Sequence, residues 1–317
     1  MRIRTRLADW WFAPAPPERL AAVRILVGAF AVLWVGGRIW ETYAVARLGG
    51  SHWKPIGVTR VLDAPLPPEA VLAIAIATTV ALVAFTIGAA YRFTAPLAAI
   101  GILWTLTYRN SFGMVFHTEN LLVLHVIALA LSPAADAWSW DRRRGAPPPP
   151  PEAGYGWILK LLAAITAITY VLAAIAKLRI AGVAWLDGEQ LRNQIAVDNL
   201  RKALLGDSIA PLATPFLDHP SGFTIFSILT IVLELAAPIV FVHPLVARLW
   251  ALSAWGFHVG VVFLMNIWFP YPLLGLAYLP LLRAERGFGW AIARWERRRN
   301  ARRGGAGSGP DEPSLPS

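Results

Sequence analysis

Residues 70–90, AVLAIAIATTVALVAFTIGAA, contain no charged side chain. A membrane-crossing helix needs about 20 mostly apolar residues, because the hydrocarbon core of a bilayer is about 30 Å thick. The whole chain has the same character, since 56% of its 317 residues are hydrophobic, only 15% are charged and the mean hydropathy is +0.53. A soluble domain carries about 25% charged residues. The composition therefore predicts an all-α, polytopic integral membrane protein.

The remaining composition narrows the functional classes. The chain has no cysteine, which excludes disulfides, thiolate metal sites and a cysteine nucleophile. Its 29 lysines and arginines outnumber its 19 aspartates and glutamates, giving a net charge of +10. In a membrane protein this excess indicates topology and not nucleic-acid binding. No GxxxxGK(S/T), HExxH or GxSxG motif is present. We expect neither a metal cofactor nor a nucleic-acid partner.

Seven apolar stretches predict about eight transmembrane helices, because the last is long enough for two. They cover residues 20–46, 70–90, 94–108, 117–134, 158–176, 222–242 and 249–282. The last stretch lacks Asp, Glu, Lys and Arg, and Asn266, Pro270 and Pro272 mark where it should break. Residues 188–205 predict an amphipathic helix at the membrane interface.

Four segments follow from this pattern. They are a cytoplasmic N-terminal segment at 1–19, a transmembrane domain at 20–283, a basic amphipathic segment at 284–303 and a disordered tail at 304–317. Basic residues flanking the spans are more numerous on the side of both termini, so both termini are predicted cytoplasmic and the loop 179–220 faces outward. No cleavable signal peptide is evident, because no apolar core precedes the first span. We expect a multi-pass protein of the cell (inner) membrane.

Polar side chains inside the spans are the candidate functional residues, since they are expensive there and usually face a cavity or a partner. With eight spans, Lys177, His117, His258 and Asn266 are expected in the outer half of the bilayer. His117 and Asn120 share one face of their helix. Lysine and histidine converging with nearby carboxylates would suit a quinone-sized or lipid-like ligand.

Each of these residues also has a simpler interpretation. Lys177 and His117 lie near span ends, where their side chains could reach the headgroups. His258 could be a core histidine bonded to a neighbouring helix. For Glu234, we favour a buried ion pair with Arg24 or Arg38 over a catalytic role.

Several local motifs occur in a specific order. They are LAAVRILVG at 20–28, GAAYR at 88–92, HTENLL at 117–122, SPAADAWSWD at 132–141, YVLAAIAKL at 170–178, WLDG at 185–188, FH at 257–258 and MN at 265–266. Together they resemble the membrane domain of the vitamin K-dependent γ-glutamyl carboxylase and its bacterial relatives, the HTTM (horizontally transferred transmembrane domain) proteins. The resemblance covers about residues 20–282.

The resemblance implies that Lys177 is the base that deprotonates vitamin K hydroquinone, which then reacts with dioxygen to give a strong base. That base removes a proton from an acceptor, and carbon dioxide adds to the resulting carbanion. A lysine in apolar surroundings suits the first step, because its neutral amine can accept a proton. We assign Lys177, His117 and His258 to catalysis, and Asn120, Tyr170, Trp185 and Asn266 to binding of the reduced quinone, either vitamin K hydroquinone or menaquinol.

Two functional hypotheses from different classes remain open. The first is a carboxylase-like enzyme that uses a reduced quinone with dioxygen and carbon dioxide as co-substrates. The second is a non-catalytic quinone- or lipid-binding module of the bilayer that serves a partner protein, with a protein substrate or partner at the outer face. A transporter is less favoured, because many transporter folds show inverted repeats and none is evident here.

Overall fold

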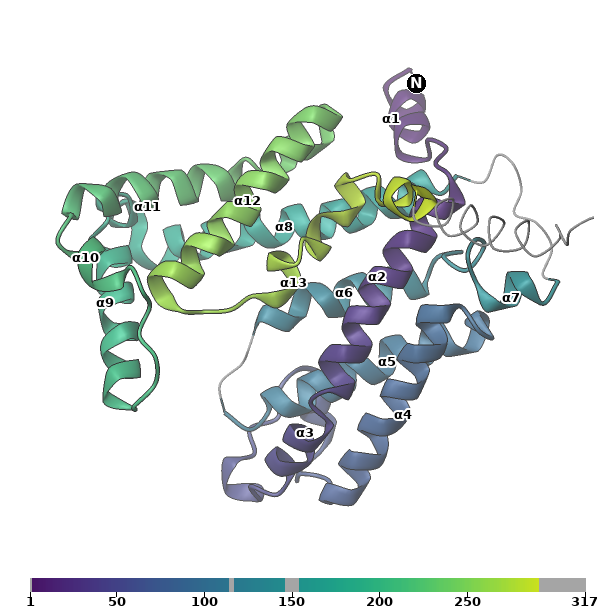
Figure 1. Cartoon of the computed structure of the whole chain (residues 1–317), viewed down its shortest axis with the longest axis horizontal. Helices are drawn as coiled ribbons and strands as arrows, with labels where there is room; N and C mark the ends of the chain where they lie inside the picture. The colour runs from purple at the N-terminus through teal and green to yellow at the C-terminus, as the bar shows by residue number, and fades with distance from the viewer. Residues whose placement is uncertain (1, 114–116, 146–153, 291–317) are drawn as a thin grey trace, which may run out of the picture.

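The computed structural model describes residues 2–113, 117–145 and 154–290, and these residues form an all-α protein (Figure 1). Its α-helices are α1 (Arg2–Trp11), α2 (Pro17–Gly36), α3 (Ile39–Ala46), α4 (Pro68–Ile87), α5 (Tyr91–Asn110), α6 (Asn120–Ala130), α7 (Trp140–Arg143), α8 (Gly156–Ala181), α9 (Glu189–Leu204), α10 (Ala213–Leu217), α11 (Pro220–Leu235), α12 (Pro244–Met265) and α13 (Pro270–Leu273). The 3-10 helices are η1 (Gly50–His52), η2 (Gly57–Val61), η3 (His117–Glu119), η4 (Gly182–Asp187), η5 (Ala237–Phe241) and η6 (Leu276–Leu281).

Two groups of helices meet at α6 and α8 (Figure 1). In the first group, α4 packs against α2, α3 and α5. In the second, α8 packs against α11, η5 and η6, and α12 packs against η5 and α13. α6 contacts α2 and α5 on one side and α8 on the other. One hydrophobic core cluster continues through both groups, so the described helices share a core.

Four of the described helical segments are long and apolar enough to cross a membrane. They are Pro17–Gly36, Pro68–Ile87, Gly156–Asp187 and Pro244–Met265. Two shorter apolar helices, α6 and α11, accompany them. The all-α membrane architecture expected from the composition is therefore confirmed. The count of eight crossings stays a prediction.

The first and fifth spans differ from the expected ones. Residues 20–46 do not form one helix, because α2 ends at Gly36 and α3 starts after Arg38. Gly36 and Gly37 weaken the helix at this point. The Arg38 side chain forms ion pairs with Glu41 at 3.3 Å and with Glu119 at 3.6 Å. The fifth span continues beyond residue 176 to Ala181, because no helix breaker precedes Gly182. Lys177 thus lies within this helix and not at its end.

Prolines shorten the later spans. The sixth, expected at 222–242, ends as α-helix at Leu235, because the next turn contains Pro238 and continues as η5. The seventh ends at Met265, and Asn266 takes the left-handed conformation with φ 47°, so the predicted break there is confirmed. The eighth is not a continuous helix but the short pieces α13 and η6, because three prolines remove backbone donors.

Segments outside the expected spans are partly described. Residues 188–205 do form a helix, α9, as predicted. The N-terminal segment contains a helix, α1, that the sequence did not indicate. Residues 284–290 are helical. The rest of the basic segment and the tail 304–317 lie outside the described residues.

A buried arginine of α2 is hydrogen-bonded to the loop that follows α6. Arg24 is fully buried and donates to the carbonyls of Ala134 at 2.5 Å and Trp138 at 2.7 Å. The Asp141 carboxylate of the same loop accepts from the first backbone amides of α5, at 2.8 and 2.9 Å. Gly88 ends α4 with φ 68°, and a side chain there would collide with Ser139. The LAAVRILVG, GAAYR and SPAADAWSWD motifs therefore build one structural joint.

Candidate functional site

The candidate site begins with an ion pair between the two antiparallel helices α8 and α11. Lys177 of α8 donates to the Glu234 carboxylate of α11. The register is set where the chain enters α11, since Thr224 donates to the carbonyl of Asp187 at 2.6 Å. Gly188 has φ 91°, and a side chain there would overlap the backbone of residues 223 and 224. The close approach of η4 and α11 therefore requires glycine.

This pairing corrects the partner expected for Glu234. Its side chain is only 3% exposed and is ion-paired, as a buried carboxylate requires, but with Lys177. Arg24 bonds to backbone carbonyls instead. Arg38 joins a separate charged group with Glu41, Arg109 and Glu119, in which Trp34 donates to Glu119 at 2.9 Å.

A chain of aromatic hydroxyls and imidazole lies beside the ion pair. The Tyr170 hydroxyl is hydrogen-bonded to His258 Nε2 at 2.9 Å and to the Tyr278 hydroxyl at 2.6 Å. All three residues are buried. Lys177 Nζ lies 5.7 Å from the centroid of the Trp185 ring, in a cation–π arrangement. The structure thus brings together four predicted site residues, Lys177, Tyr170, Trp185 and His258.

Three buried polar atoms in this cluster have no hydrogen-bond partner. They are Glu234 Oε2, His258 Nδ1 and Trp185 Nε1. An unpaired buried polar atom is rare in native proteins and costs about 1–3 kcal/mol. A carboxylate oxygen accepts a hydrogen bond and an indole N–H donates one, so the cluster offers a polar ligand both an acceptor and a donor.

An apolar cavity of about 570 Å³ lies beside the cluster, between α9, α11 and α12. Trp250 lines it and also packs edge-on against Tyr170, with 5.0 Å between ring centroids. Thr230 and Ser253 contribute hydroxyls, and the remaining lining is largely apolar. The arrangement therefore combines a small polar cluster with a neighbouring apolar chamber, as small-molecule sites do.

The other predicted site residues lie elsewhere. Asn120 starts α6 and is exposed, and Asn266 follows α12. No hydrogen bond or ion pair joins either to Lys177 within the part of the chain that the structure describes. His117 opens η3, but its side chain lies outside the described residues. His125, in the following helix α6, is fully buried and hydrogen-bonded to the Tyr271 hydroxyl at 2.7 Å.

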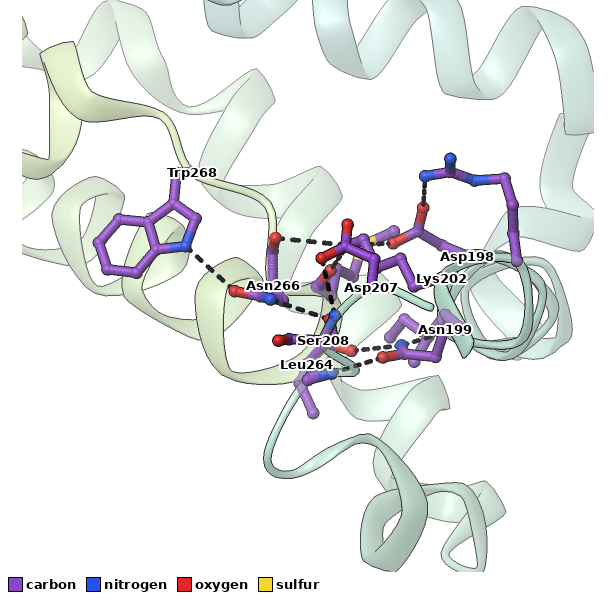
Figure 2. Close-up of polar contacts among 12 residues, drawn as sticks. Asp198, Asn199, Lys202, Asp207, Ser208, Leu264, Asn266 and Trp268 are labelled. Atoms are coloured by element: carbon purple, nitrogen blue, oxygen red, sulfur yellow. Dashed lines mark hydrogen bonds and ion pairs between the residues drawn. The ribbon is translucent and has the colours of Figure 1, made fainter. Parts of the chain in front are cut away.

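Asn266 belongs instead to the contact that holds α9 against the end of α12 (Figure 2). Its side-chain amide donates to the carbonyl of Ser208 at 3.0 Å. Lys202 donates to the carbonyls of Met265 and Asn266 and to Asp198. Asn199 donates to the carbonyl of Leu264 at 3.0 Å and accepts from the amide of residue 210 at 2.7 Å. These bonds satisfy the last carbonyls of α12.

Sequence reasoning missed one member of the cluster, Tyr278, and gave another, Glu234, the wrong partner. Tyr278 lies in a stretch without charged residues, and nothing in its neighbours distinguishes it from an interfacial tyrosine. Glu234 was noticed as an expensive buried charge, but its partner depends on the register between α8 and α11. The one available signal was that a buried carboxylate needs a cation.

The fold and the cluster define an all-helical membrane protein with a buried, ion-paired site beside an apolar cavity. The chain belongs to the HTTM family, whose domain matches residues 12–285. The HTTM domain is a membrane domain related to γ-carboxylase. No curated protein and no solved structure matches the chain.

Proposed function

We propose that the chain is a carboxylase-like membrane enzyme that couples oxygenation of a reduced quinone to proton abstraction from, and carboxylation of, an acceptor. The observation that carries this proposal is the cluster of half-buried Lys177 with buried Glu234, Tyr170 and His258 beside an apolar cavity. We further propose eight crossings with both termini cytoplasmic.

The residues present fit a reduced quinone such as vitamin K hydroquinone or menaquinol. Such a molecule has a polar ring with two hydroxyls and an apolar tail. The unpaired atoms of Glu234, His258 and Trp185 can accept from and donate to the ring. The largely apolar cavity beside Trp250 suits the tail. When bound with dioxygen, the quinol supplies the strong base that carboxylation requires.

The ion pair supports a role for Lys177 as base. The Glu234 carboxylate fixes the position of the Lys177 amine beside Trp185. As the base, Lys177 would take a hydroxyl proton of the quinol at this position. With the Tyr170 hydroxyl donating to His258 Nε2, the unpaired His258 Nδ1–H can donate a hydrogen bond where negative charge develops. His117 stays a predicted contributor to the same charge stabilisation.

The test compares Lys177→Ala with Arg179→Ala in purified protein. Arg179 is exposed and lies two residues further along the same helix, so its loss removes a charge without touching the cluster. With reduced menaquinone or vitamin K and dioxygen, we expect epoxide from wild type and Arg179→Ala, and none from folded Lys177→Ala, by mass spectrometry. Wild-type turnover in Lys177→Ala would refute the role of Lys177.

The second candidate is a non-catalytic quinone- or lipid-binding module that serves a partner protein. The observation that favours it is that the Lys177 amine is already engaged by Glu234. This function predicts that wild type binds a quinone and forms no epoxide. A partner would then be recovered by crosslinking through the segment 179–220.

A further inference from the structure

A second pocket, of about 310 Å³, lies at the opposite end of α8 from Lys177. It is lined by the end of α1, the start of α2, the first turns of α8 and the region where η5 leads into α12. Arg19, Lys160 and His243 contribute its ionisable side chains. None of these residues takes part in the candidate site described above.

Among the described residues, the two strong cations in this pocket form no ion pair with a carboxylate. Arg19 donates to the carbonyls of Pro280 at 3.0 Å and Leu282 at 3.2 Å. Lys160 donates to the carbonyl of Trp11 at 3.3 Å. Within the described ranges, no carboxylate lies at ion-pair distance from either. Both cations therefore keep N–H donors that no carboxylate of the described residues uses.

The surroundings add positive potential. Arg19 and Lys160 are close enough to repel each other. Among the described residues, Glu285 attracts Arg19 from beyond ion-pair distance, and Arg283 and Arg248 each repel it less strongly. The helices α8 and α12 both begin at the pocket, so the positive ends of their dipoles add to the charge. An anion entering here would meet several cations.

The rest of the wall is suited to a lipid. Leu159, Ala163, Val240 and Ala247 add apolar side chains to the lining. At the rim, Trp10 stacks edge-on with Phe241, with 5.7 Å between ring centroids, and lies 5.1 Å from Lys160 Nζ. Tryptophan is enriched where membrane meets water. A free phosphate would leave the apolar lining without contacts, whereas the chains of a phospholipid would cover it.

We propose that this pocket binds the phosphate headgroup of an anionic phospholipid, with Arg19 and Lys160 as its ligands. The side of the membrane fits this assignment, because the pocket lies beside α1 at the N-terminal end, which the charge pattern places on the cytoplasmic side. Basic pockets between helices on that side bind anionic headgroups in other membrane proteins. The inference does not depend on the chemistry of Lys177.

The test uses the full chain purified in a neutral detergent, with phosphatidylglycerol, phosphatidylcholine or inorganic phosphate added. Retained lipid is counted by native mass spectrometry. We expect phosphatidylglycerol to be retained in preference to phosphatidylcholine. Each cation lost should weaken binding roughly fivefold, so Lys160→Gln binds about fivefold and Arg19→Gln/Lys160→Gln about thirtyfold more weakly. Lys160→Arg keeps the charge and should bind like wild type.

The control is Arg92→Gln, which removes one exposed charge outside the pocket. Equal weakening by Arg92→Gln and Lys160→Gln would overturn the proposal, since binding would then follow net charge. Unchanged affinity in folded Lys160→Gln would overturn it as well, and this variant leaves the structural bonds of Arg19 intact. Inorganic phosphate that displaces phosphatidylglycerol at equal concentration would overturn the assignment to a lipid.

Discussion

At the scale of single residues, Lys177 is defined by its ion pair with Glu234. A buried carboxylate is costly without a cation, and a lysine in an apolar helix is costly without an anion. Each residue therefore satisfies the other, and the pair holds α8 to α11. A structural role and the proposed chemical role coincide in one contact, so activity and stability must be measured together.

We expect Glu234→Gln to lower the stability of the protein by about 2–3 kcal/mol, because it leaves Lys177 without its anion. Lys177→Met should cost a similar amount. The double variant should recover at least about 1 kcal/mol relative to the sum of the two, since neither charge is then left alone. Thermal unfolding in detergent measures these values, with the exposed Glu69→Gln as the control. Strictly additive losses would show that the two side chains do not interact.

At the scale of elements, α9 is attached to the end of α12 by polar contacts. Lys202 and Asn199 supply donors to carbonyls that the helix itself cannot satisfy. α9 also lines the apolar cavity through Leu191 and Ile195. The docking of α9 therefore determines how open the cavity is on that side.

We expect Lys202→Met to release α9, seen as faster hydrogen exchange across residues 189–217. Arg201→Met should change the exchange little, because Arg201 is exposed.

Acid should also release α9 from the end of α12. Burial opposes the charge of Asp198, but hydrogen bonds from Lys202 and Arg201 outweigh it and lower the pKa of Asp198 below its usual value. The stability that ionised Asp198 contributes to the folded protein is present above about pH 4 and is lost as pH falls through the lowered pKa. Exchange that is indifferent to acid would contradict the role of Asp198.

At the scale of the whole molecule, the two helix groups share one core, and the sites occupy different ends of α8. The Lys177 cluster lies toward its C-terminal end and the cationic pocket at its first turns. One long helix therefore connects the candidate catalytic cluster with the proposed lipid site.

Orientation can be tested directly, because the chain has no cysteine and any introduced thiol is unique. We expect Asp207→Cys, in the loop after α9, to react with a membrane-impermeant thiol reagent added to intact cells. Arg92→Cys, at the start of α5, should react only after permeabilisation. These outcomes follow from an outward loop 179–220 and cytoplasmic termini. The reverse pattern would invert the predicted topology, and labelling of both positions from outside would rule out an odd number of crossings between them.

The amino-acid sequence by itself determined the class of the protein and most of its helices. Long apolar stretches must be shielded from water, and they must satisfy their own backbone groups, so membrane helices follow from composition. The sequence also predicted the break at Asn266, where α12 ends, whereas α4 ends at Gly88, two residues before the predicted end of the second span. Where apolarity alone was used, as at residue 176, the predicted end was wrong, because a lysine does not terminate a helix.

Only the tertiary structure decided which polar residues meet. Lys177, Tyr170, Trp185 and His258 come together, while Asn120 and Asn266 lie apart from them. The partner of Glu234 depends on the antiparallel register of α8 and α11, which the packing around Gly188 establishes. Residue periodicity describes one helix at a time, whereas a site is formed by contacts between helices. The physical reason is that such contacts depend on packing and rotation, which local sequence does not contain.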